Sequence, residues 1–255
     1  MAIHVARATP ATAIGDHRLI ARLGALAVGT AAMGGGISLL VWSRLGMLPM
    51  DVLHLGVSHA LGWTFGESLI ACQFLLALTF IPLRIRLGLA TAVALVIPAA
   101  VADILLMVLP TTAGPPFRMA AFLIGAPLFC CGIAVYLRAG LGSLPRDGIM
   151  LAVAGARDDL SRASPRRTAL VRIGLDAAFV AAGAALLGPA NALHAGALAP
   201  GTVLLALGSG PLIVVFRRLA NRIPGLSPAP TQAAPPRGTG CHRRMQPAHT
   251  GGGQA

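Results

Sequence analysis

The sequence predicts an all-α polytopic membrane protein with about six transmembrane helices. The prediction depends on composition, on the length of the apolar segments and on the placement of the arginines. Hydrophobic residues make up 56% of the 255 residues and charged residues 11%, with a mean hydropathy of +0.77. Water-soluble domains carry about 25% charged residues. Long unbroken apolar runs do not suit the alternating strands of a membrane barrel, so helices are expected.

Six apolar segments have the length needed to cross a bilayer, close to the ~20 residues that span its hydrocarbon core. They define a predicted transmembrane domain at 19–219, between a polar N-terminal tail at 1–18 and a Pro- and Gly-rich tail at 220–255 that is expected to be disordered. The predicted segments are 19–43, 64–83, 87–109, 118–138, 168–188 and 197–216.

The arginines predict the orientation of these segments. All 20 basic residues are Arg. If the chain crosses the membrane six times, the arginines next to the apolar segments fall on one side of it, except for Arg44 and Arg118. The positive-inside rule then places both termini in the cytoplasm. The lack of Lys and the abundance of Ala and Gly suggest a bacterial source. Because the net charge of +12 follows the segment ends and the tail, it indicates the lipid bilayer as partner and not nucleic acid.

An internal repeat organises the predicted domain. Residues 22–51 align without gaps to residues 118–147, and both end in the pattern L-G-x-L-P-x-D. The first repeat covers about 19–110 and the second about 115–219, each with three spans. An odd number of spans inverts the second copy relative to the first, as in many secondary transporters. The identical pairs include Gly29/Gly125, Gly36/Gly132, Gly46/Gly142, Pro49/Pro145 and Asp51/Asp147.

The shared pattern predicts a broken helix in each repeat. Gly46 and Gly142 interrupt the preceding span, and Pro49 and Pro145 suit the first turn of a new helix because proline needs no N–H partner there. An apolar stretch follows at 52–61 and again at 148–156. Each repeat is therefore expected to contain a short extra helix, either re-entrant or lying in the membrane interface.

Three segments resemble a known family. They are LGMLPMDVLHLGVSHALGWTFG (45–66), LRAGLGSLPRDGIM (137–150) and GTVLLALGSGPLI (201–213). They are similar to the bacterial YczE/YyaS/YitT family of integral membrane proteins, and the similarity extends over about 19–219. The resemblance implies a multi-pass inner-membrane protein of undefined activity, and it supplies no catalytic residues.

Ionisable residues in apolar surroundings are the candidates for a substrate or ion pathway, because a charge at membrane depth is unfavourable. These candidates are Asp51, His54, Asp103 and Asp147. Asp51 and Asp147 form a repeat-related pair that could instead cap helix N-termini. His54 lies one helical turn after Asp51 and could relay protons with it, or be a hydrogen-bonded interface histidine. Asp103 is alone in its span, and a structural pair is its alternative role.

The residue patterns favour transport over catalysis. A small-solute transporter or permease, carrying a small molecule or ion, explains the inverted repeat and the sparse acids. The alternative is a non-transporting membrane scaffold or regulator that acts through a protein partner. No enzyme is predicted, because no hydrolase or metalloprotease motif is present. The four cysteines lack metal-ligand spacing, so neither a metal nor a cofactor is expected.

Overall fold

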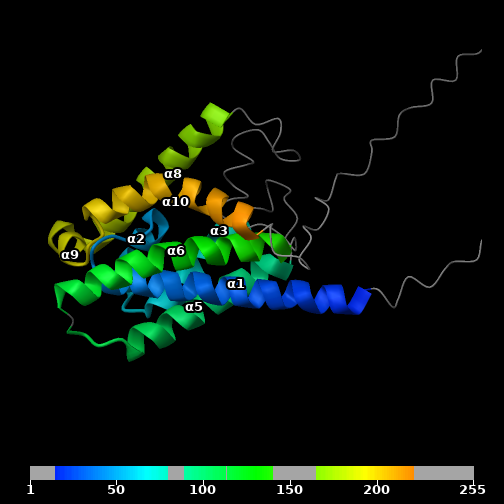
Figure 1. Cartoon of the computed structure of the whole chain (residues 1–255). Coiled ribbons are helices and arrows are strands. Elements are labelled where there is room, and N and C mark those ends of the chain that lie inside the picture. The colour runs from blue at the N-terminus through cyan, green and yellow to red at the C-terminus, as the bar shows by residue number, and fades with distance from the viewer. Residues whose placement is uncertain (1–14, 80–88, 113, 140–164, 221–255) are drawn as a thin grey trace, which may run out of the picture.

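A computed structural model describes residues 15–79, 89–112, 114–139 and 165–220. These residues form helices joined by short connections, and they contain no strand (Figure 1). The predicted tail at 220–255 falls almost wholly outside the described residues, as do Gly142, Pro145 and Asp147. The helices are α1 (Gly15–Ser43), α2 (Pro49–Leu61), α3 (Phe65–Leu78), α5 (Leu89–Val108), α6 (Pro115–Ala139), α8 (Pro165–Leu187), α9 (Pro189–His194) and α10 (Pro200–Ala220).

Each of the six predicted segments coincides with a helix, but fewer than six have the length of a complete span. Among the described residues, four helical stretches are long and apolar enough to cross a membrane: Ile20–Ser43, Pro115–Arg138, Leu170–Leu187 and Pro200–Leu219. The bent pair α2 and α3, with an angle of 114°, would add a fifth. α3 is too short alone because it has only 14 residues, and α5 contributes the shorter apolar stretch Ala92–Val108.

Glycines bring α1 and α6 into backbone contact along the centre of the bundle. A Cβ added to Gly29 would lie 2.8 Å from the carbonyl oxygen of Gly132, and one added to Gly36 would lie 2.8 Å from that of Gly125. Because the later glycine of α1 meets the earlier one of α6, the helices run antiparallel. Small residues at such a crossing allow the van der Waals packing that associates helices in membranes.

Two further helices pack on this central pair. α5 lies against α1, where Gly34 sits so close to Pro98 that an added Cβ would come within 2.6 Å of its carbonyl oxygen. α10 lies against α6, where the Cys130 sulfur is 3.9 Å from the carbonyl oxygen of Ser209. The main apolar core lies between these helices and includes Leu26, Leu40, Phe129 and Ile133.

The short helix α2 is mostly buried and joins α8 to the bundle. Pro49 begins it, as the sequence predicts. Gly56 of α2 and Gly183 of α8 are in close backbone contact, with 2.6 Å from an added Gly56 Cβ to the Gly183 oxygen. At the far end, Gly62 adopts a left-handed φ of 69° and ends the helix. The chain then turns sharply into α3.

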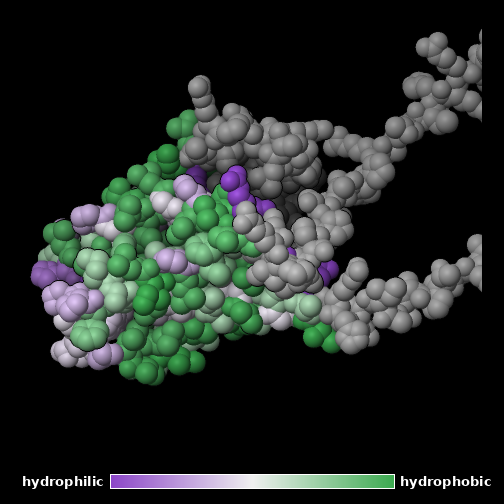
Figure 2. All heavy atoms as spheres, in the orientation of Figure 1, coloured by the Kyte–Doolittle hydropathy of each residue, from purple (hydrophilic) through white to green (hydrophobic). Residues whose placement is uncertain are grey.

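Apolar side chains cover much of the outer surface. Met107, Leu123 and Leu207 are 78%, 62% and 66% exposed, whereas Thr30, Ser38 and Ser68 are fully buried. Figure 2 shows hydrophobic atoms over much of the visible face, with hydrophilic atoms at the end that carries α9 and again toward the opposite end. This distribution suits a surface that contacts lipid, because a water-soluble protein rarely exposes such large apolar patches.

Candidate functional site

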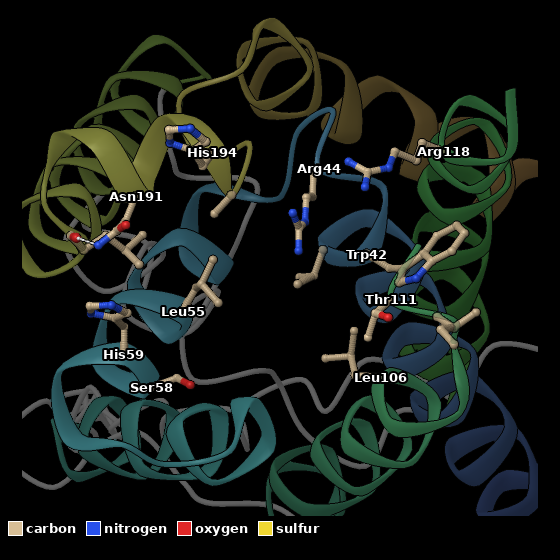
Figure 3. Close-up of a pocket in the computed structure, with 14 residues that line it drawn as sticks. Trp42, Arg44, Leu55, Ser58, His59, Leu106, Thr111, Arg118, Asn191 and His194 are labelled. Carbon is tan, nitrogen blue, oxygen red and sulfur yellow. Dashed lines mark hydrogen bonds between the residues drawn. The ribbon is translucent and has the colours of Figure 1, made fainter. Parts of the chain in front are cut away.

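A cavity of about 510 Å³ lies at the end of the bundle near α9. It is lined where α1, α2, α5 and α8 end and where α6 begins, so residues far apart in the sequence meet there (Figure 3). Its volume is in the range of small-molecule pockets, about 300–1,000 Å³. Polar groups that line it include Arg44, His59, Thr111, Arg118, Asn191 and His194.

The cavity combines positive charge with hydrogen-bonding groups. Figure 3 shows the Arg44 side chain pointing into the opening and the Arg118 guanidinium directed toward it. Among the described residues, no acidic side chain lines the cavity. The Trp42 indole lines one wall, and its Nε1 donates a hydrogen bond to the carbonyl oxygen of Pro110 at 2.8 Å. This bond ties the end of α1 to the connection that leads to α6.

Arg44 has an unusual backbone conformation. Its φ of 56° makes it the one non-glycine residue with a positive φ in the part of the chain that the structure describes. It follows the last residue of α1, a position where glycine is preferred because a Cβ disfavours left-handed backbone. Gly196 packs directly on the Arg44 backbone, with no room for a Cβ. The connection that precedes α10 therefore holds Arg44 in place.

Asp51 and His54 form a buried pair inside α2. The Nδ1 atom of His54 is 3.2 Å from the Oδ1 atom of Asp51, and their side chains are 2% and 3% exposed, respectively. The His54 ring meets Phe65 edge-on, with centroids 6.0 Å apart. No described group hydrogen-bonds the Oδ2 atom of Asp51 or the Nε2 atom of His54. Each partner therefore keeps one atom for a further hydrogen bond.

The structure does not place these two residues in the cavity. The part of the wall that α2 contributes consists of Leu55, Ser58 and His59, and neither Asp51 nor His54 belongs to the lining. Asp51 also makes no cap, because the N-cap position of α2 is Leu48 and has no side-chain cap bond. Asp147, its counterpart in the repeat, lies outside the described residues.

Asp103 connects two helices. Its Oδ1 atom accepts a hydrogen bond from the backbone N–H of Gly66 at 2.6 Å, and its Oδ2 atom accepts one from the Thr64 hydroxyl at 2.7 Å. The Thr64 hydroxyl in turn accepts from the backbone N–H of Glu67 at 3.1 Å, in a capping box. The carboxylate therefore holds the positive end of α3 against α5, a structural role for this predicted pathway residue.

Sequence reasoning missed most of the cavity. The hypothesis of a substrate or ion pathway centred on acidic residues, so it did not include His59, Arg44 or Arg118. The signal that points to the cavity is the departure of these two arginines from the charge pattern of all the others. His194 and Asn191 gave no signal, because only the fold brings α9 to this end of the bundle.

Long apolar helices, an exposed apolar surface and buried polar groups together define a helical membrane protein. Within that class, the chain belongs to a family of unknown function, DUF6198, whose match covers residues 20–218. A relative from Haemophilus influenzae, named uncharacterized protein, is 33% identical over 194 residues, 75% of this chain and 81% of the relative.

A second relative confirms the resemblance predicted from the sequence. The uncharacterized membrane protein YczE of Bacillus subtilis is 28% identical over 120 residues, which are 46% of this chain and 56% of that protein. No solved structure matches the chain. The comparisons therefore establish the family and the membrane class, and any activity is to be argued from the geometry.

Proposed function

We propose that this membrane protein is a small-solute transporter and that the cavity receives the solute. The cavity itself carries the proposal. It is large enough for a small molecule, it is open to one end of the bundle, and hydrogen-bonding groups from both halves of the chain line it. Transporters bind their solutes between the halves of the fold in this way.

The glycine contacts support an inverted repeat. Gly29 of the first repeat meets Gly132 of the second, while their repeat-related partners Gly36 and Gly125 meet each other. Such an exchange of equivalent contacts is what a two-fold axis produces. Because α1 and α6 are antiparallel, that axis would lie in the membrane plane. We propose two inverted three-helix repeats in the inner membrane, with both termini in the cytoplasm and the cavity on the opposite side.

The Asp51–His54 pair is our candidate for the coupling step, with Asp147 as its repeat-related counterpart. A buried carboxylate and imidazole in contact, with one unpaired atom each, are the types of group that proton relays in membrane proteins use. The pair lies on α2, the helix that lines the cavity with Leu55, Ser58 and His59. We propose that a proton on this pair and a solute in the cavity affect each other through that helix.

One observation favours the alternative, a scaffold or regulator. Asp103 and Glu67 are engaged in capping bonds, and Asp176 lies 3.9 Å from the Nε atom of Arg172. Acidic residues that only stabilise helices are what a non-transporting protein would contain. A scaffold or regulator does not explain the cavity, however, so we rank transport first.

A blocking substitution tests the proposal. Ala195, which follows the last residue of α9, lines the cavity, whereas Ala190 within α9 is exposed and lies outside the lining. In a solute screen on purified protein, a bound solute stabilises the native state by mass action, by about 2.7 kcal/mol at a hundredfold excess over Kd, and so raises the melting temperature. We expect Ala195→Trp to lose this shift and Ala190→Trp to keep it.

Uptake of the same solute into proteoliposomes then separates the two functions. Accumulation with wild type and Ala190→Trp but not with Ala195→Trp supports transport, and loss of the response to an imposed pH gradient in Asp51→Asn supports proton coupling. A solute that binds in the cavity but never crosses the bilayer would favour a regulator.

A further inference from the structure

We infer that the cavity is an oxyanion site, which binds a small carboxylate or phosphate group through Arg44 and Arg118. The inference rests on the proposed function in one respect, that the anion would be the transported solute. Arginine is suited to this task, because its planar guanidinium donates paired hydrogen bonds to two oxygens of a carboxylate or phosphate.

The cavity lining has the charge of an anion site. Arg44 and Arg118 both line it, the described lining includes no carboxylate, and His59 and His194 add groups that can donate hydrogen bonds. The Asn191 side chain is oriented by its own bond to the Leu187 carbonyl at 3.1 Å. In a site partly shielded from water, two guanidinium groups in a lining that holds no described carboxylate favour an anionic occupant.

The backbone conformation of Arg44 indicates that its side chain has a binding role. Its left-handed conformation is unfavourable for a residue with a Cβ. In the gap-free repeat alignment, the residue opposite Arg44 is Gly140, the type that such a helix end prefers. The first repeat thus carries arginine where glycine would be more stable. Strain of this kind is characteristic of binding sites.

The charge pattern of the whole chain leads to the same two residues. The other arginines next to the predicted spans fall on one side of the membrane, as the positive-inside rule requires, and that rule does not account for Arg44 and Arg118. Both exceptions line one cavity. A ligand with negative charge explains why they occur together.

A binding measurement in nanodiscs of phosphatidylcholine tests the inference. The probes are inorganic phosphate, acetate and succinate, with glycerol and choline as neutral and cationic controls. We expect at least one of the three anions to raise the melting temperature, and Arg44→Gly and Arg118→Gln to weaken its binding by about ten- to a hundredfold. Arg217→Gln, at the exposed end of α10, is the matched control and should bind as wild type does.

Arg44→Gly distinguishes lost binding from lost folding. Because glycine adopts a positive φ without a Cβ penalty, the ligand-free variant should melt close to wild type or above it. If Arg44→Gly unfolds instead, Arg44 is a structural residue, and Arg118→Gln decides. The inference holds if Arg118→Gln keeps the wild-type melting temperature and loses anion binding, and it fails otherwise.

Lipid provides a second source of the same chemistry. If soluble anions have no effect but added phosphatidylglycerol stabilises wild type and not Arg44→Gly, the site binds a lipid phosphate, and the oxyanion assignment holds without a soluble solute. If glycerol or choline binds as well as the anions and the arginine variants are unaffected, the oxyanion inference is wrong while transport of another solute stands. No response to any probe or lipid overturns the inference, and the uptake assay still decides on transport.

Discussion

Asp103 illustrates how a single carboxylate can satisfy a sequence criterion for function through a structural role. An acid in an apolar span is a candidate pathway residue by default, yet both of its oxygens accept hydrogen bonds at the start of α3. Arg44 is the opposite case. It resembles an ordinary charged residue at a helix end, but its backbone is strained and its side chain enters a cavity.

The role of Asp103 leads to a prediction on stability. Asp103→Asn replaces one accepting oxygen by an NH₂ group and so removes a hydrogen bond at the start of α3. We expect the free energy of unfolding to fall by about 1–2 kcal/mol. This loss corresponds to a melting temperature roughly 2–8 °C lower. Thr64→Val removes the partner hydroxyl, and the double variant should be less destabilised than the sum of the single ones. Unchanged melting with lost solute binding would instead assign Asp103 to the pathway.

Helix packing in this protein depends on glycine at the α1–α6 crossing. The two helices that the sequence aligns as repeats are in backbone contact, and the contacts are exchanged between equivalent positions. Elsewhere the same residue type has no such role, since nothing lies within 4 Å of a Cβ added to Gly24 on the same α1. The function of a glycine is therefore decided by the neighbouring helix.

A matched pair of substitutions on α1 tests this interpretation. Gly36→Ala would place its Cβ 2.6 Å from the Phe129 backbone nitrogen, so we expect a destabilisation of about 1–3 kcal/mol from overpacking. Gly24→Ala has open space and should be neutral or slightly stabilising, because alanine has the higher helix propensity. Thermal unfolding in detergent measures both. Equal melting temperatures for the two variants would show that the crossing is looser than described.

At the scale of the whole molecule, the cavity and the helix ends that carry most of the arginines are expected to face opposite sides of the membrane. In a background without native cysteines, Ser58→Cys should react with an impermeant maleimide added to intact cells, because Ser58 lines the cavity. Arg217→Cys, at the last turn of α10, should react only after the membrane is opened. Labelling of both positions from one side would refute the proposed orientation.

Composition and apolar length alone determined the helical membrane class, because a bilayer leaves few other ways to satisfy the backbone. The sequence also predicted a helix in each of the six apolar segments and the start of α2 at Pro49, since proline suits a first helical turn. Only the tertiary structure decided which polar residues act together. Asp103 meets the start of α3 and Arg44 meets Gly196 because helices separated in the sequence pack side by side. The cavity is likewise built from the ends of different helices, and no local pattern in a sequence records which ends will meet.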